Sequence, residues 1–203
     1  MALRTLIVVM LATASTAHAE ERTRRWDFGL VFAGGAEQIG DRTFAQVGIS
    51  AWAARSITPS LAIAVRGELL GTNTDDATGM TIIGETTRGL VGVDWRVFGT
   101  GEAFIPELFV DAGVGRELTA WDRGTVGRQL AYVAIEAHQG FDIDPGGFIR
   151  GIRHLGMPLG VRLQIAPAID SLTIARACSQ CGTTPPARTD LAFLVYYGLD
   201  FGR

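Results

Sequence analysis

The 203-residue sequence contains no lysine, and all 18 of its basic residues are arginine. They are set against 21 Asp and Glu residues, which gives a formal net charge of −3. A general basic field that would attract nucleic acid is therefore excluded. Arginine also tolerates partial burial better than lysine, because its charge is delocalised and less tightly hydrated.

Long apolar runs are scarce after the N-terminal segment, where we find no stretch of about 18 uninterrupted apolar residues. Hydrophobic residues nevertheless make up 47% of the chain, and the mean hydropathy is +0.23. This combination excludes a disordered chain and disfavours a helical membrane protein. It leaves a soluble β-rich protein, or a membrane protein whose apolar residues alternate with others.

Motifs that bind phosphates or mark a hydrolase nucleophile are absent: there is no Walker A, GxGxxG or GxSxG sequence. Cysteine is limited to Cys178 and Cys181, spaced as CxxC. A metal site would need further ligands nearby, and a redox pair would need a helix N-terminus. We therefore expect a local disulfide between the two cysteines, and neither a metal site nor a cofactor.

The N-terminus has the three parts of a secretory signal. Arg4 supplies the positive region, residues 6–11 are apolar, and Ala17-His18-Ala19 matches the small-x-small cleavage pattern. The sequence thus predicts a signal peptide over residues 1–19 and one domain over residues 20–203. Export would place the mature chain where disulfides persist.

Alternation with a period of two runs through the mature chain. In residues 60–70, for example, Ile63 and Val65 share one face, while Arg66 and Glu68 share the other. Such alternation predicts strands, and no segment shows a helical stripe. We expect a seventh strand between Gly147 and Asp170, limited by Pro158 and Pro167 because proline cannot donate to a sheet ladder. Eight strands are expected, around residues 26–33, 45–53, 60–70, 88–97, 107–115, 131–138, 161–165 and 191–201.

One face of these strands is apolar, and the other carries small residues with charges of both signs. Lipid contact suits the apolar face, while ion pairs suit a cramped interior. Since backbone groups in lipid find no water, the sheet must close, and eight strands give a barrel that side chains can fill. The sequence predicts an all-β, eight-stranded antiparallel up-and-down transmembrane β-barrel. Its expected internal ion network comprises Arg66, Glu68, Arg88, Asp94, Arg96, Glu107, Asp111, Glu136, His138 and Arg162.

Long and short connections alternate along the chain. We expect long polar connections over residues 34–43, 71–85, 117–127 and 170–189, with shorter ones between them. Aromatic residues near strand ends suggest the interfacial girdles of a membrane barrel; these are Trp26, Trp95, Phe98, Tyr197 and Phe201.

Together, the signal, the eight alternating strands and the amphipathic last strand, residues 191–201, resemble the small bacterial outer-membrane β-barrel proteins of the OmpA/OmpX-like type. The resemblance covers essentially the whole mature chain and rests on patterning. It implies location in the bacterial outer membrane, long loops facing outward, and contact with membrane lipids and lipopolysaccharide. It also implies assembly by the barrel-assembly machinery, which reads a last strand typically ending in Phe. Here Gly202 and Arg203 follow Phe201.

Several functions stay open at this point. The leading hypothesis is a monomeric barrel with a structural, adhesive or envelope-maintenance role and no catalysis. A narrow pore, a lipid-modifying enzyme and a secreted lipid-binding barrel are the alternatives. An enzyme could use Glu136 and His138 with Ser50 or Asp94, although an internal ion network explains the pair better. Asp75 and Asp76 could bind Ca²⁺ weakly, but a solvated loop tip is the simpler interpretation.

Overall fold

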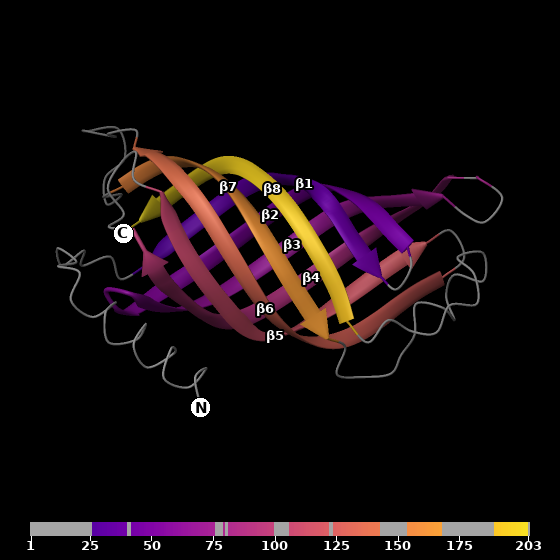
Figure 1. Ribbon diagram of the computed structural model, residues 1–203, viewed down its shortest axis with the longest axis horizontal. Coiled ribbons are helices and arrows are strands. Elements are labelled where there is room, and N and C mark those ends of the chain that lie inside the picture. The colour runs from indigo at the N-terminus through magenta and orange to yellow at the C-terminus, as the bar shows by residue number, and fades with distance from the viewer. Residues whose placement is uncertain are drawn as a thin grey trace, which may run out of the picture.

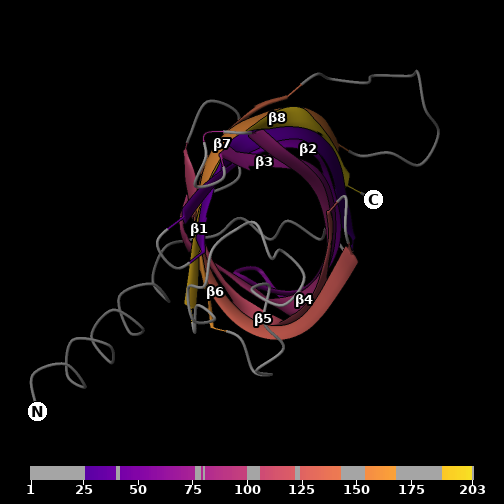
Figure 2. The ribbon, with the colours of Figure 1, turned by 90° about the vertical axis from the view of Figure 1, so that its right-hand side faces the viewer.

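The chain forms a single closed barrel of eight antiparallel strands, each paired with its neighbours in sequence and the last with the first (Figures 1 and 2). The computed structural model describes residues 26–39, 42–75, 79, 81–99, 106–121, 124–142, 154–167 and 189–202. The strands are β1 (Asp27–Ile39), β2 (Arg42–Thr58), β3 (Leu61–Asp75), β4 (Thr81–Phe98), β5 (Glu107–Trp121), β6 (Gly124–Asp142), β7 (His154–Pro167) and β8 (Thr189–Gly202). The predicted fold class is confirmed.

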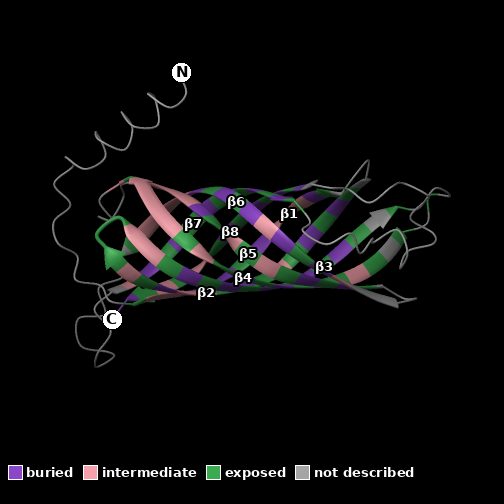
Figure 3. Ribbon diagram, turned by 90° about the horizontal axis from the view of Figure 1, so that it is seen from below, coloured by how far each residue is buried: buried purple, intermediate pink, exposed green. Residues whose placement is uncertain are grey.

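The alternation in the sequence becomes an inside and an outside. Ile63 and Val65 are 50% and 55% exposed, whereas Arg66 and Glu68, which follow on the same strand, are 8% and 3% exposed. Figure 3 shows the same alternation of buried and exposed residues along the strands. A soluble barrel would hide its apolar face, so this barrel is inverted, with the charges inside.

Three of the expected long connections are wrong, because the strands extend into them. Strand structure extends through most of residues 34–43, 71–85 and 117–127: β1 runs to Ile39, and β2 starts at Arg42. Likewise β3 and β4 reach Asp75 and Thr81, and β5 and β6 reach Trp121 and Gly124. Polarity suggested loops there, but in a barrel with a polar interior the inward residues of a strand are polar too.

Strand β7 also extends further than expected, since it starts at His154 and contains Pro158. Pro158 pairs with Gly140 of β6, while the register between β7 and β8 passes from Gly156 to Leu159 without a pair at Pro158. The proline is therefore accommodated by a local break in one ladder. The expected signal peptide, the connection over residues 170–188 and both cysteines lie outside the described residues.

Aromatic residues gather at the barrel end where β1 begins and β8 ends, called the terminal end below. Phe28 stacks on Trp26 at 6.0 Å and on Phe201 at 5.5 Å between ring centroids, and Phe98 is 62% exposed. Tyr197 lies further along β8 and contacts Phe32. Within the described ranges, no helix has the length and apolar character to cross a bilayer.

Glycines on the inner face make room for large rings. A Cβ at Gly29 would collide with the Trp52 ring, one at Gly92 with the Tyr132 hydroxyl, and one at Gly160 with the Tyr196 ring. Ring and glycine thus fill the interior jointly across strands. Three leucines complete the packing near the middle and are at most 2% exposed: Leu70, Leu90 and Leu130.

Candidate functional site: the charged interior and its terminal cavity

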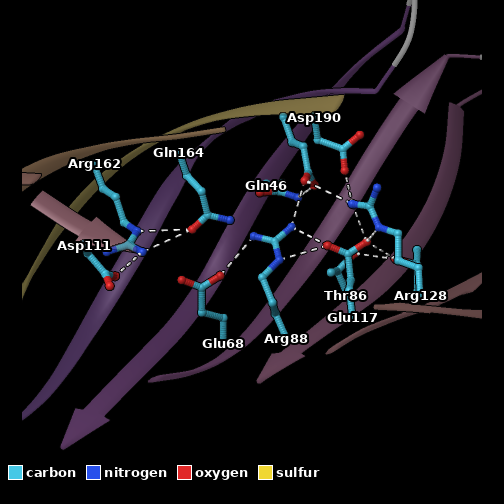
Figure 4. Close-up of polar contacts among 12 residues, drawn as sticks. Gln46, Glu68, Thr86, Arg88, Asp111, Glu117, Arg128, Arg162, Gln164 and Asp190 are labelled. Atoms are coloured by element: carbon cyan, nitrogen blue, oxygen red, sulfur yellow. Dashed lines mark hydrogen bonds and ion pairs between the residues drawn. The ribbon is translucent and has the colours of Figure 1, made fainter. Parts of the chain in front are cut away.

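The interior of the barrel is crossed by two groups of buried ion pairs (Figure 4). The first, called the Arg88 cluster, has one guanidinium shared by three carboxylates. Arg88 contacts Glu37 at 2.8 Å, Glu68 at 3.0 Å and Glu117 at 2.6 Å. Its side chain is only 1% exposed, and it draws its partners from β1, β3 and β5, so it ties three strands to its own strand, β4.

Arg128 of β6 extends this cluster towards β8. It donates to Glu117 at 2.8 Å and forms an ion pair with Asp190. On the β2 side, the Gln46 amide donates to Glu37 at 2.5 Å. With these contacts the cluster reaches every strand except β7, and it therefore spans the barrel cross-section.

The second group, called the Arg162 cluster, lies nearer the terminal end. Arg162 of β7 contacts Asp111 and Glu136, each at 2.8 Å. Glu136 also accepts from Arg66 at 2.8 Å and from the Tyr196 hydroxyl at 2.6 Å. The Tyr132 hydroxyl donates to Asp111 at 2.9 Å. Arg162 thus bridges two carboxylates, and arginine and phenol donors together satisfy the carboxylate oxygens, as a desolvated network requires.

A cavity of about 130 Å³ lies between the Arg162 cluster and the terminal end. Arg96 bonds Glu107 at 3.0 Å, and His138 Nε2 lies 3.1 Å from the same carboxylate. Phe109 stacks on the His138 ring at 5.0 Å between centroids. Asp94 also lines the cavity.

All ten residues expected in the internal network lie on the inward face. Six are buried, and the other four, Asp94, Arg96, Glu107 and His138, are partly exposed and line the cavity. Asp94 shares a side-chain hydrogen bond with Asp111 and lies in the electrostatic field of Arg66. The sequence interpretation missed four charged members of the Arg88 cluster because it assigned them to, or beside, connections: Glu37, Glu117, Arg128 and Asp190. Continuing the period-two pattern past residue 33 on β1 and residue 115 on β5 would have found the first two.

The residues considered for catalysis do not assemble as a triad. His138 Nδ1 lies 3.3 Å from the Tyr196 hydroxyl and 3.8 Å from Glu136, whereas Ser50 is absent from the cavity lining. In the described part of the chain, no group of three or more His, Cys, Asp or Glu is arranged to hold a metal ion. Asp75 accepts a hydrogen bond from Thr81 at 3.0 Å, and Asp76 lies outside the described residues.

Comparisons with known proteins give structural matches only. No protein-family model matches the chain, and no curated protein sequence matches it significantly. The outer membrane protein OprG from Pseudomonas aeruginosa is similar in structure, with a TM-score of 0.48, 7% identity, and coverage of 89% of this chain and 97% of that one. Ail, the attachment invasion locus protein of Yersinia pestis, matches with a TM-score of 0.40 and 10% identity, and the match covers 87% of this chain and 97% of Ail. The N-terminal β-barrel domain of Pseudomonas aeruginosa OprF matches with a TM-score of 0.40 and 10% identity, and the match covers 89% of this chain and 98% of that domain.

Proposed function

We propose that this chain is an integral outer-membrane β-barrel protein with a structural, adhesive or envelope-maintenance role and no catalysis. The observation that carries the proposal is the inverted barrel. Arg88 and Arg162 are each 1% exposed at its centre, while outward residues such as Val133 and Ile135 are 52% and 51% exposed. A belt of this kind is stable only against acyl chains, and a closed sheet leaves no unpaired backbone edge in them.

The same observation argues against a secreted lipid carrier. Such a barrel would need an apolar interior able to accept an acyl chain, and a polar exterior to stay in solution. Here two ion-pair clusters occupy the interior, and the apolar residues would face water. The burial pattern therefore supports a membrane location over a soluble one.

The proposal includes an orientation, for which the terminal end is the reference. Trp26, Phe98 and Phe201 suit an interface, and both ends of the sheet, Asp27 and Gly202, lie there. We place this end at the periplasmic face, which leaves the β1–β2, β3–β4, β5–β6 and β7–β8 connections facing outward. An adhesive or envelope-stabilising function would then reside on that outward surface.

A closed interior distinguishes this proposal from a narrow pore. The Arg88 cluster draws side chains from seven strands, and its charged groups are at most 4% exposed in the described barrel. An ion that crossed the barrel would have to separate these pairs. The clusters therefore favour internal cross-bracing over conduction.

The location is tested by expressing the full chain in a Gram-negative host and fractionating the envelope. We expect the protein in the outer-membrane fraction, with gel mobility that changes when the sample is boiled in SDS, since a folded barrel resists SDS until heated. A protein recovered in the soluble periplasmic fraction, with the same mobility before and after boiling, would contradict the proposal.

A lipid-profiling experiment tests the absence of catalysis. Lipid A is compared from cells that carry no plasmid, the wild-type chain, or His138→Ala. We expect three identical profiles. A new lipid A species that depends on His138 would contradict the non-catalytic role and favour the lipid-modifying enzyme.

A further inference from the structure

The outward face of β5 carries one arginine among apolar side chains. Arg116 is exposed and lies between Val114 and Leu118, which are 52% and 40% exposed on the same face. Among the described residues, no carboxylate forms an ion pair with Arg116. The protein thus presents a cation without a counter-charge on a surface that otherwise suits acyl chains.

The guanidinium of Arg116 reaches away from the terminal end. Arg116 pairs with Gln129 of β6, yet its Nη2 atom lies 3.7 Å from the position that a Cβ would take on Gly127. Because β6 runs towards the terminal end, Gly127 is further from that end than Gln129. Long basic side chains at a membrane surface turn their charge towards the nearer interface in this way. The side chain therefore directs its charge out of the apolar belt.

The position of Arg116 along β5 agrees with a lipid interface. It is nine residues from Glu107, where β5 begins at the terminal end. With a rise of about 3.4 Å per residue and a strand tilt of about 40°, nine residues advance roughly 23 Å along the barrel axis. The apolar band of a membrane barrel is about 25 Å tall. A band that begins at the aromatic terminal end therefore ends close to Arg116, at the level of the lipid headgroups.

A bare strip of sheet leads from Arg116 into the belt. Arg116 is opposite Gly89 across the β4–β5 ladder, and Gly89 is opposite Gly67 across the β3–β4 ladder. Apart from chain neighbours, no atom lies within 4 Å of the Cβ position of either glycine. Ala51 of β2 continues this strip, called the bare row below. Since Gly67 is only six residues from the terminal-end start of β3, the bare row descends obliquely from Arg116 towards the terminal end.

We propose that Arg116 binds the phosphate of an anionic membrane lipid, and that an acyl chain of this lipid lies over the bare row. The inference rests on the proposed outer-membrane function, because only a chain in a bilayer meets such lipids. A guanidinium can donate two parallel, charge-assisted hydrogen bonds to phosphate oxygens. A free phosphate would leave the glycines uncovered, and an uncharged lipid would leave the arginine unpaired, so one molecule that carries both groups fits the surface best.

The test measures lipid binding by native mass spectrometry. The full mature chain is refolded in a neutral detergent without lipid and titrated with phosphatidylglycerol, lipid A or phosphatidylcholine. The first two carry net negative charge on phosphate, whereas choline neutralises the third. We expect saturable one-to-one complexes with the anionic lipids, and binding of phosphatidylcholine that is about tenfold weaker or more. Inorganic phosphate, the probe without an acyl chain, should not displace the bound lipid at equal concentration.

Three variants localise the headgroup and the acyl chain. Arg116→Gln should weaken binding of the anionic lipids about tenfold or more, because the charge-assisted hydrogen bonds are lost. Arg116→Lys keeps the charge without the planar fork, and its affinity should fall between those of the wild type and Arg116→Gln. Gly89→Leu keeps the arginine but covers the bare row, and it should also weaken lipid binding.

Arg55→Gln is the matched control. Arg55 is another outward arginine, but it lies near the terminal end with its guanidinium over the Trp26 ring. The substitution removes the same charge from the barrel surface, and we expect the variant to bind the anionic lipids as the wild type does.

Heat-dependent gel mobility shows whether each variant is folded. Equal binding of all three lipids, displacement by inorganic phosphate, equal losses in Arg55→Gln and Arg116→Gln, or unchanged binding in folded Arg116→Gln or Gly89→Leu would each overturn the assignment. Complexes with only one of the two anionic lipids would support the site and identify its headgroup. Fractionation tests the location separately: an outer-membrane protein that binds no anionic lipid would disprove this site and leave the proposed function standing.

Discussion

Arg88 shows why this chain can place charge at the centre of a membrane-sized barrel. Its planar guanidinium offers five N–H donors in a fixed fork, and three carboxylates use them. A lysine ammonium could not serve three partners on different strands with the same geometry. The buried arginines here therefore act through directed hydrogen bonds as well as through charge.

Removing this guanidinium should destabilise the barrel strongly. Arg88→Ala leaves Glu37, Glu68 and Glu117 buried without their shared cation, and loss of one partner of a buried pair costs about 3–5 kcal/mol. We expect the free energy of unfolding, measured by urea titration in phospholipid vesicles, to fall by that amount. Arg55→Ala, at an exposed position over Trp26, is the control and should change it by less than about 1 kcal/mol.

Replacing Arg88 by Lys separates charge from geometry. The charge is kept but the fork is lost, so we expect stability between that of the wild type and Arg88→Ala. If the lysine variant unfolds at the wild-type urea concentration, the directed hydrogen bonds contribute nothing beyond the charge, and the role assigned to the guanidinium plane is wrong.

At the scale of the strand, the two faces differ in how they use glycine. The Tyr196 ring fills the space beside inward Gly160. At outward Gly67 and Gly89, by contrast, nothing lies within 4 Å of the place where a Cβ would be. The same residue type therefore reflects close packing on one face and a bare surface on the other.

This difference predicts opposite effects of one substitution. Gly160→Ala would press on the Tyr196 ring and the His138 side chain, and overpacking should cost about 1–3 kcal/mol. Gly67→Ala adds a methyl group to open space and should be neutral or stabilising by up to about 1 kcal/mol, because alanine has less entropy to lose. Urea unfolding of both variants is the measurement, and equal effects would show that the faces are assigned wrongly.

For the whole molecule, the belt of outward apolar residues decides where the protein can reside. Val65 pairs with Val91, and Val91 with Val114, all outward and 46–55% exposed. Figure 1 shows the strands tilted around the barrel, and Figure 3 shows exposed positions alternating with buried ones along them. The surface is suited to an acyl environment as a whole, whatever the contribution of a single side chain.

An arginine in that belt should prevent stable insertion. Val65→Arg is expected to destabilise the barrel in vesicles by roughly 2–4 kcal/mol, as for a cation near the bilayer midplane. Thr81→Arg, at an exposed position on the opposite end of β4 from the aromatic residues, is the matched control and should have little effect. Equal tolerance of the two substitutions would place the belt outside the bilayer.

A conductance measurement tests whether the interior of the whole barrel is closed to ions. Purified wild-type protein in a planar bilayer should show no steady unit conductance, because the Arg88 and Arg162 clusters fill the cross-section. A reproducible unit conductance from the wild type would favour the pore. Weakening the plug with Arg88→Ala should raise the frequency of transient openings, provided that the variant is folded.

The sequence alone predicted the number of strands, their antiparallel order and the face on which most residues lie, because a period of two leaves only one choice within a strand once one of its residues, such as Val65 in β3, is placed. It left open where strands end, since Glu37 and Glu117 are as polar as loop residues, and the alternation that continues through them marks an inner face only if the strand is known to continue. Nor could it pair charges: Arg88 and Glu37 are 51 positions apart, and which carboxylate meets which guanidinium depends on register and tilt. The terminal cavity likewise brings together residues from distant strands, with small side chains such as Ala54, Ser56 and Ala62 among its lining, an arrangement that distance along the chain does not encode.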